Sequence, residues 1–185
     1  MNEILETPRL ILTPFTAMDG PLLHLIFTNA HIRKYLWDDQ PISREQAEEI
    51  IEQNDRFFTE DQWGLWKVLG KVTTETIGFV GLWPFFGESQ PQLIYGIMPD
   101  FVRRGFAMES AGKVIEYAFE NLNFKYVDAS TDQPNLASQK VAEGLGMTPL
   151  REEKIENKPT LFYRITAKEY NQLKQNTYEF TKQQP

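Results

Sequence analysis

The most informative stretch of this sequence reads Pro99-Asp100-Phe101-Val102-Arg103-Arg104-Gly105-Phe106-Ala107. A β-rich run over residues 92–98 precedes it, and a helical pattern over residues 106–122 follows it, with small and apolar residues on one continuous face. A turn that leads from a strand into a helix presents unpaired backbone N–H groups at the positive end of the helix dipole. The position of this stretch therefore favours a loop that binds an anion.

The residue types in the loop agree with anion binding. Gly105 and Ala107 have little or no side chain, so an anion can approach the backbone closely. Arg103 and Arg104 add positive charge in an otherwise acidic chain. The alternative reading is a surface turn with two solvated arginines before an ordinary helix.

Strand and helix patterns alternate along the rest of the chain. Further strands are expected at residues 9–13, 63–69, 76–82, 125–130, 148–154 and 159–165. Helices are expected to begin near residues 16, 43 and 166, and another over 135–145, which Gly146 would end in a left-handed conformation. The pattern predicts an α/β domain over residues 1–185, a mixed sheet with helices on its faces, and a frayed end at about 176–185.

Composition excludes several classes of protein. The 185 residues include 19 Lys and Arg against 26 Asp and Glu, a net charge of −7, which argues against a nucleic-acid-binding protein. With no cysteine the chain has no disulfide, thiolate metal site or thiol nucleophile, and with two histidines no metal site is expected. The longest apolar run, residues 77–87, is too short to span a membrane, and the N-terminus lacks the pattern of a signal peptide. We therefore expect a soluble, cytoplasmic protein that does not bind membranes.

The loop resembles the acyl-CoA pyrophosphate loop of the GNAT N-acetyltransferases, whose pattern is Gln/Arg-x-x-Gly-x-Gly/Ala. Gly105-Phe106-Ala107 matches the second half of that pattern. The first half departs from it, because Val102 occupies the Gln/Arg position and Arg103 stands where related proteins often carry glycine. The resemblance implies coenzyme A, as acetyl-CoA, for the anion.

Three further segments resemble one branch of that family, the RimJ/RimL-like ribosomal-protein acetyltransferases. The first is Thr7-Pro8-Arg9-Leu10-Ile11-Leu12. The second has two parts, Asn135-Leu136-Ala137-Ser138 and Glu143-Gly144-Leu145-Gly146-Met147. The third is Ile165-Thr166-Ala167-Lys168-Glu169-Tyr170. The match extends over about residues 7–170 in the same element order. It implies the GNAT fold, with a mostly antiparallel central sheet of about six or seven strands, a splayed and bulged strand before the loop, and about four helices.

The resemblance also implies which residues bind the donor. The backbone of Gly96, Ile97 and Met98 would face the thioester, and Asn135 and Ser138 would contact the pantetheine arm or the thiol. The diphosphate would lie on Arg103, Arg104, Gly105, Phe106, Ala107 and Met108. From its place before a helix, Asn135 has an alternative role as an N-cap.

Two catalytic positions depart from the better-equipped relatives. Ala142 stands where many of them carry a tyrosine as general acid, which leaves Ser138 as the nearest hydroxyl for that role. Gln92 stands where many carry a glutamate as general base. The other nearby carboxylates, Glu88, Asp128 and Asp132, are expected to be solvated.

The missing base bears on the acceptor. A lysine amine with a pKa near 10.4 is about 0.04% neutral at pH 7, whereas an α-amine with a pKa near 8 is about one tenth neutral. The difference, about 3 to 4 kcal/mol, is of the size that a positioned base contributes. An enzyme without such a base is better suited to an α-amine, which favours peptide N-termini as a hypothesis.

The acceptor groove in this family borders residues 31–41. There Trp37 and Asp38 would receive a cationic group, and Trp83 would lie across the groove. The alternatives are an anchored loop with exposed acids at residues 37–39 and a hairpin around Trp83 that packs into the core.

The leading interpretation is an acetyl-CoA-dependent N-acetyltransferase in which a primary amine attacks the thioester directly in a ternary complex. The acceptor is a peptide or protein N-terminus or a small molecule, and the protein is a monomer or a homodimer. Two alternatives stay open: a catalytically inactive acyl-CoA-binding or regulatory protein on the same fold, and an acetyltransferase for a polyamine or an antibiotic.

Overall fold

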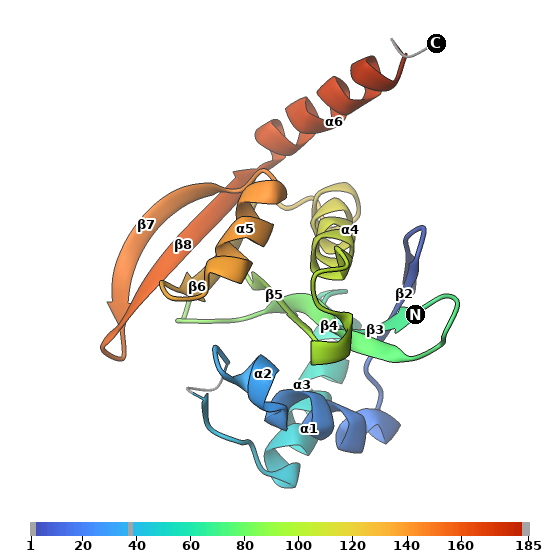
Figure 1. The fold of residues 1–185 in the computed structure, drawn as a ribbon, viewed down its shortest axis with the longest axis vertical. Coiled ribbons are helices and arrows are strands. Elements are labelled where there is room, and N and C mark those ends of the chain that lie inside the picture. Colours follow the sequence, from blue (N-terminus) through green and yellow to red (C-terminus); the bar gives the residue numbers. More distant parts are fainter. Residues whose placement is uncertain (1–2, 37–38, 183–185) are drawn as a thin grey trace. The chain divides into compact units, whose positions relative to one another are not determined.

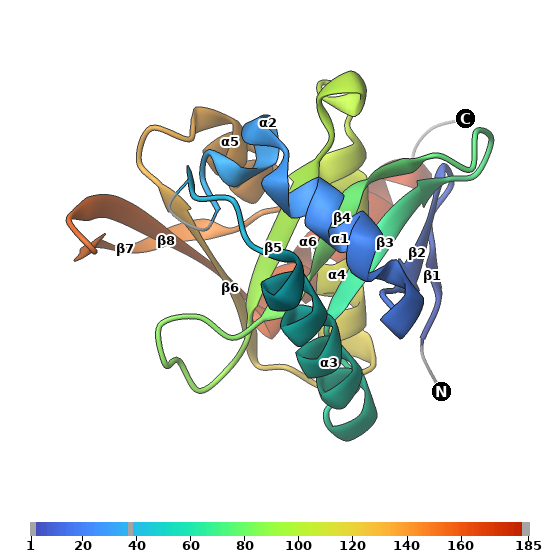
Figure 2. The ribbon, with the colours of Figure 1, turned by 90° about the horizontal axis from the view of Figure 1, so that it is seen from below.

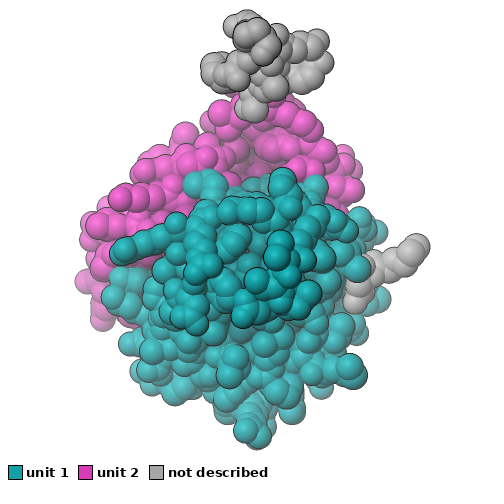
Figure 3. Space-filling view, turned by 45° about the vertical axis from the view of Figure 1, so that its right-hand side comes forward, with its two compact units in different colours: residues 1–114 teal, residues 115–185 magenta. Residues whose placement is uncertain are grey.

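The computed structural model describes residues 3–36 and 39–182, with side chains as far as residue 176. The chain forms two compact units, residues 1–114 (unit 1) and residues 115–185 (unit 2), which Figure 3 colours separately. The division falls inside one helix, α4 (Phe106–Glu120).

Unit 1 contains an antiparallel sheet and the helices that cover it (Figure 1). Its strands are β1 (Leu5–Glu6), β2 (Leu10–Pro14), β3 (Leu65–Gly70), β4 (Thr76–Trp83) and β5 (Gln92–Ile97), paired in the order β1-β2-β3-β4-β5. Its helical segments are η1 (Ala17–Asp19), α1 (Gly20–Thr28), α2 (Ala30–Arg33), α3 (Arg44–Glu60), η3 (Pro99–Phe101) and the first half of α4. Every strand pair is antiparallel.

Helices α1 and α3 lie across one face of this sheet (Figure 2). Local sequence explains where α3 begins: Ser43 accepts a hydrogen bond from the Gln46 N–H at 3.1 Å, and the Gln46 side chain accepts one from the Ser43 N–H at 2.7 Å. The apolar stripe of α3 then packs with α1 and with Phe79 and Trp83 of β4 in one core cluster. This core fixes the face of β4 and β5 that points toward the helices.

Asn54 is a polar group inside this core. Its side chain accepts a hydrogen bond from the Leu65 N–H at 2.6 Å and donates to the carbonyl oxygens of Phe15 and Leu65 at 3.3 and 3.4 Å. A buried amide with all these partners satisfies backbone groups that would otherwise be costly to bury. Asn54 thus joins α3 to the sheet.

Unit 2 contains a second antiparallel sheet, in the order β6-β8-β7. Its elements are β6 (Tyr126–Asp132), α5 (Leu136–Gly144), β7 (Thr148–Ile155), β8 (Lys158–Thr166) and α6 (Ala167–Lys182). Gly146, with φ = 79°, follows α5 in the left-handed conformation expected from the sequence, and a Cβ there would lie 2.3 Å from Leu173 Cδ1. A capping box of Thr166 and Glu169 begins α6.

The expected GNAT fold, with antiparallel strands and flanking helices, is confirmed. The counts differ, because the described residues form two sheets of five and three strands and six α-helices. β1 and α2 were not predicted from the sequence, because both are too short to show a periodic pattern. The terminal helix α6 runs to Lys182, and the frayed end expected at about 176–185 stays a prediction. Residues 183–185 lie outside the described part.

The expected bulge in β5 is not found. Its pairs with β4 continue in register from Gln92↔Trp83 to Ile97↔Gly78. The physical reason is the absence of side chains at the closest approach: a Cβ on Gly78 would lie 2.0 Å from the carbonyl oxygen of Gly96. β5 is nevertheless an edge strand, since β4 is its only partner among the described residues.

No helix in residues 3–36 and 39–182 has the length and apolar character required to cross a bilayer.

Candidate functional site

The loop between β5 and α4 has a run of backbone N–H groups without acceptors. Phe101 and Val102 donate their N–H groups within the η3 turn, to Met98 and Pro99. The first such bond of α4 is donated by Glu109 to the Gly105 carbonyl, at 3.0 Å. Between these bonds, the N–H groups of residues 103–108 have no hydrogen-bond acceptor within the described part of the chain. Six successive amides are therefore available to a ligand, as the sequence predicted for this place.

The backbone conformation directs these amides. Arg103 and Gly105 are both left-handed, with φ = 61° and 80°, whereas Arg104 between them is not. Alternation of this kind turns successive N–H groups toward a common side and forms an anion-binding concavity. Arg103 adopts the conformation that glycine favours, so the departure from the family pattern at this position leaves the shape of the loop intact.

The charges around the loop suit an anionic ligand. The side chains of Arg103 and Arg104 are exposed, and the Arg104 guanidinium lies 5.6 Å from the centre of the Phe101 ring. The amides also lie at the N-terminus of a fifteen-residue helix, where the dipole favours negative charge. The loop therefore fits a diphosphate.

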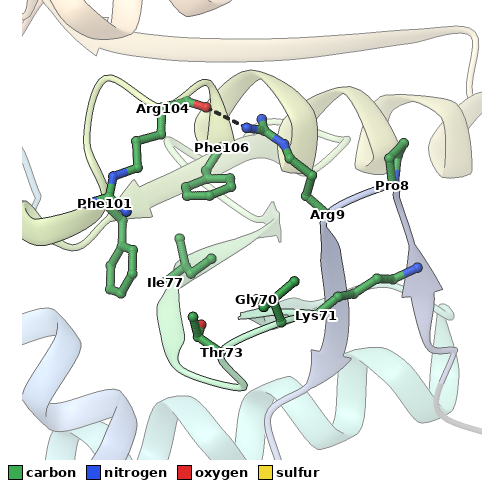
Figure 4. A pocket seen from close by; sticks show the side chains of 10 residues that line it. Pro8, Arg9, Gly70, Lys71, Thr73, Ile77, Phe101, Arg104 and Phe106 are labelled. Atoms are coloured by element: carbon green, nitrogen blue, oxygen red, sulfur yellow. Dashed lines mark hydrogen bonds between the residues drawn. The ribbon is translucent and has the colours of Figure 1, made fainter.

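A network of hydrogen bonds that was not predicted from the sequence holds this loop, and Figure 4 shows one of its bonds, from Arg9 to the Arg104 backbone. Arg9, just before β2, pairs with Glu109 in the first turn of α4, with both Nε and Nη2 at 2.6 Å from Oε2. Thr7 Oγ1 donates to the same carboxylate at 2.6 Å, and Arg9 Nη1 donates to the Arg104 carbonyl at 3.0 Å. These residues belong to the Thr7–Leu12 segment that resembles the family, but no local signal connects them to residue 109.

The network keeps Glu109 ionised. Burial opposes ionisation of its carboxyl group, but hydrogen bonds from Thr7 and from the backbone and side chain of Arg9 outweigh this effect and lower the pKa of Glu109. Glu109 is thus ionised, and the positive charge of Arg9 compensates its negative charge next to the loop.

A pocket of about 220 Å³ lies beside this network (Figure 4). Its wall consists of Pro8, Arg9, Gly70, Lys71, Val72, Thr73, Ile77, Phe101, Arg104 and Phe106. The wall combines apolar and aromatic side chains with the guanidinium groups of Arg9 and Arg104.

The donor contacts predicted at Gly96, Ile97 and Met98 differ in whether the backbone N–H is available to a ligand. The Met98 N–H donates to the Ile77 carbonyl at 2.8 Å and is already used within the sheet. N–H groups alternate between the two edges of an antiparallel strand, so the N–H of Ile97 points away from β4, whereas that of Gly96 faces Phe79. Among the three, Ile97 has its amide on the open edge.

Gln92 begins β5 and is 1% exposed, yet neither its Oε1 nor its Nε2 has a hydrogen-bond partner among the described residues. It lies opposite Trp83 in the ladder, on the face that carries Ile94 and Gly96. The position therefore holds a buried, neutral amide and no carboxylate.

Gln92→Leu is expected to raise the free energy of unfolding by about 1 kcal/mol, because it removes two buried polar atoms that gain nothing in the folded chain. Asn54→Leu is the matched control, a second buried amide whose polar atoms are all bonded. It should lower the free energy of unfolding by about 2 kcal/mol. Urea denaturation of both variants gives the two values, and an equal loss in both would contradict the assignment of Gln92 as unsatisfied.

The predicted acceptor residues fall in two groups. Trp83 is 7% exposed and belongs to the core cluster, with its ring 5.2 Å from that of Phe57 in an edge-to-face arrangement. This is the packing that the sequence left open as the alternative to a groove wall. Trp37 and Asp38 lie outside the described residues.

The predicted residues of unit 2 lie at the start of α5. Asn135 caps this helix, since its side-chain oxygen accepts a hydrogen bond from the Ser138 N–H at 3.2 Å. Ser138 is half-buried in the first turn, and Ala142 is buried one turn later. The N-cap role of Asn135 is thus observed, and it is compatible with a further contact from the side-chain amide nitrogen.

Asp128 is not the solvated carboxylate that the sequence analysis expected. It is 4% exposed, and Arg164 binds it in a bidentate pair with both N–O distances at 2.7 Å. Arg164 thus occupies both carboxylate oxygens of Asp128.

Comparison with known proteins agrees with this geometry. Residues 9–148 match the model of the acetyltransferase (GNAT) domain. The uncharacterized N-acetyltransferase YoaA of Bacillus subtilis (strain 168) is 30% identical over 147 residues, which are 79% of this chain and 83% of that protein.

Solved structures share the fold. An acetyltransferase from Agrobacterium tumefaciens str. C58 superposes with a TM-score of 0.76 at 24% identity, covering 89% of this chain and 95% of that one. RimL, a ribosomal L7/L12 alpha-N-protein acetyltransferase solved with coenzyme A, superposes with a TM-score of 0.74 at 16% identity, covering 89% and 98%. With the family match and the amide-lined loop together, this chain belongs to the GNAT family of acetyltransferases, whose acetyl donor is acetyl-CoA.

Proposed function

We propose that this acetyltransferase modifies the α-amine of a peptide or protein N-terminus, in a RimJ/RimL-like reaction. The amine nitrogen forms a bond to the acetyl carbon while the carbon–sulfur bond breaks, with donor and acceptor bound together. The absence of cysteine from the whole sequence supports this direct route, because no thiol is available to carry the acetyl group.

The donor side of the proposal rests on unit 1. The six amides of residues 103–108 would bind the diphosphate of acetyl-CoA, with Arg103 and Arg104 nearby. The Ile97 N–H, on the open edge of β5, would stabilise negative charge on the thioester oxygen. The roles predicted for Asn135 toward the pantetheine arm and for Ser138 as the proton donor to the leaving thiolate remain part of the proposal. The assignment of residues 1–185 to one domain is also part of the proposal. The family match supports it, because the matched residues 9–148 belong partly to unit 1 and partly to unit 2.

The observation that carries the choice of acceptor is the neutral, buried Gln92 at the start of β5. No carboxylate occupies this position, and Asp128 is already paired with Arg164. Without a base, the acceptor must supply its own neutral amine, which costs about 3 to 4 kcal/mol more for a lysine side chain than for an α-amine at pH 7. RimL, named as an alpha-N-protein acetyltransferase, offers a precedent on the same fold.

A pair of peptides tests the acceptor. One has a free N-terminus and no lysine; its twin has a blocked N-terminus and one lysine. The free α-amine is expected to react about 200-fold faster in kcat/KM at pH 7, the ratio of the neutral fractions of the two amines. A preference for the lysine twin would contradict the proposal.

The pH profile provides a control. If the enzyme supplies no base, log kcat/KM rises with pH until the pKa of the acceptor amine is reached. The plateau should therefore begin near pH 8 for the α-amine and shift when acceptors with other amine pKa values are used. A plateau that stays at one pH for every acceptor would instead reveal a base on the enzyme.

A panel of amines with thiol release as the readout separates the remaining readings. Turnover only with polyamines or antibiotics would indicate a small-molecule acetyltransferase, and coenzyme A binding without turnover on any amine would indicate an acyl-CoA-binding protein.

A further inference from the structure

Arg9 contacts both the donor loop and the first turn of α4, with its backbone N–H and with its guanidinium group. Its backbone N–H donates to Glu109 Oε1 at 2.9 Å, its guanidinium pairs with Oε2 at 2.6 Å, and Nη1 donates to the Arg104 carbonyl at 3.0 Å. The guanidinium carbon lies 4.6 Å from the centre of the Phe106 ring. All five guanidinium donors belong to one rigid plane, so these contacts fix the loop and the first turn of α4 relative to each other.

The bond to Arg104 determines where the next amide points. In a trans peptide unit the carbonyl of one residue and the N–H of the next point in opposite directions. Arg9 holds the Arg104 carbonyl on its own side of the loop (Figure 4), so the Gly105 N–H is directed to the other side. Gly105 lies at the centre of the six free amides, so the direction of its N–H affects the whole concavity.

The pair with Glu109 removes an electrostatic obstacle. A carboxylate in the first turn of a helix is favoured by the dipole, but it also repels an anionic ligand at the same N-terminus. Glu109 is only 15% exposed, and its partners Thr7 and Arg9 lower its pKa, so its charge persists. Arg9 compensates this charge at contact distance.

We propose that Arg9 is a positioning residue for the diphosphate of acetyl-CoA, acting through the Arg104 carbonyl and through neutralisation of Glu109. This inference rests on the proposed donor-binding role of residues 103–108. It assigns a function to the Thr7–Leu12 segment, which lies about 100 residues from the loop in the sequence.

Arg9→Met tests the proposal by calorimetry on the whole protein. The Kd of coenzyme A is expected to rise about 10-fold, while the Kd of pantetheine, which lacks the diphosphate, stays unchanged. The shift in Tm that coenzyme A produces should shrink accordingly. Arg9→Lys should fall between wild type and Arg9→Met, because an ammonium keeps the charge but cannot reproduce the planar fork.

Turnover gives an independent readout. With acetyl-CoA the KM of the donor should rise in Arg9→Met while kcat is retained, and with S-acetylpantetheine neither value should change. Arg44→Met, which removes one exposed arginine at the start of α3, is the matched control and should leave the Kd of coenzyme A unchanged.

Two results would overturn the proposal. One is an unchanged Kd of coenzyme A in Arg9→Met; the other is an equal loss with coenzyme A and with pantetheine, which would indicate a purely structural role. If Arg9→Met does not fold, the same comparison is made with Arg9→Lys. Failure of the proposed function is distinguishable, because a wrong acceptor leaves these coenzyme A measurements unchanged, whereas a protein without the proposed donor site would not bind coenzyme A even as wild type.

Discussion

Gly105→Val is expected to weaken the binding of coenzyme A about 100-fold, a loss of about 3 kcal/mol. Gly105 has φ = 80°, a conformation that a β-branched residue avoids, and a Cβ there would lie 3.3 Å from Arg9 Nη2. The added side chain therefore opposes both the left-handed turn and the contact that directs the neighbouring amides. The Kd of coenzyme A, measured by calorimetry, checks the prediction.

Gly87→Val provides the matched control. Gly87 also has a left-handed conformation, with φ = 66°, but a Cβ there would have no neighbour within 4 Å. In both variants the left-handed backbone should lower the free energy of unfolding by a similar amount, about 1 to 2 kcal/mol, so their Tm values should fall together. Only Gly105→Val should lose affinity for coenzyme A. Equal affinities in the two variants would show that the loop conformation does not matter for binding.

Gly78→Ala is expected to lower the free energy of unfolding by about 3 to 5 kcal/mol, a large fraction of the stability of a domain of this size. The new methyl group would lie 2.0 Å from the Gly96 carbonyl oxygen and 3.0 Å from Ile97 Cα. Both are backbone atoms of β5, so no side-chain rotation relieves the overlap, and β5 must move away from β4. Urea denaturation measures the loss.

The control for this variant is Gly20→Ala in α1. The nearest atom to a Cβ at that position is Glu48 Cγ at 3.8 Å, an ordinary contact, and the backbone is already helical. This change should be neutral or should stabilise the protein by up to about 1 kcal/mol. A Gly78→Ala variant within 1 kcal/mol of wild type would mean that β4 and β5 are not as close as described.

If Gly78→Ala still folds, its rate of acetyl transfer is also informative. The strand that must move carries the Ile97 amide and leads directly into η3 and the loop. The acetyl-transfer rate should therefore fall more than the population of folded protein does, because the amide is displaced even in folded molecules.

Several features of the fold follow from local sequence. The capping box of Ser43 and Gln46, the helix begun by Phe106 and the left-handed Gly146 each depend on residues within a few positions of one another. Such contacts form wherever the local pattern occurs, and for this reason the sequence predicts them well. The free amides of residues 103–108 belong to the same class, because any helix leaves its first N–H groups without partners.

The predictions from sequence that the structure corrects failed for the opposite reason. The regular register of β5 and the bidentate pair of Asp128 with Arg164 both depend on residues far apart in the chain. No period or spacing in the sequence shows which distant side chain will occupy the space next to a given residue. Nothing in the local sequence of β5 shows that Gly78, across the ladder from Ile97, lets the two strands approach closely and stay in register.

The amino-acid order alone predicted the family of this protein, its acetyl donor and the loop proposed to receive the donor, since these predictions depend on a strand, a turn and a helix that are consecutive in the chain. Folding in three dimensions added what consecutive residues do not contain. It brings Thr7 and Arg9 to Glu109, encloses Gln92 without a hydrogen-bond partner in the described part of the chain, and uses the Met98 amide within the sheet while that of Ile97 stays at the edge. The reason is physical: burial and electrostatic compensation are properties of the neighbours in space, and the chain selects those neighbours only when it folds.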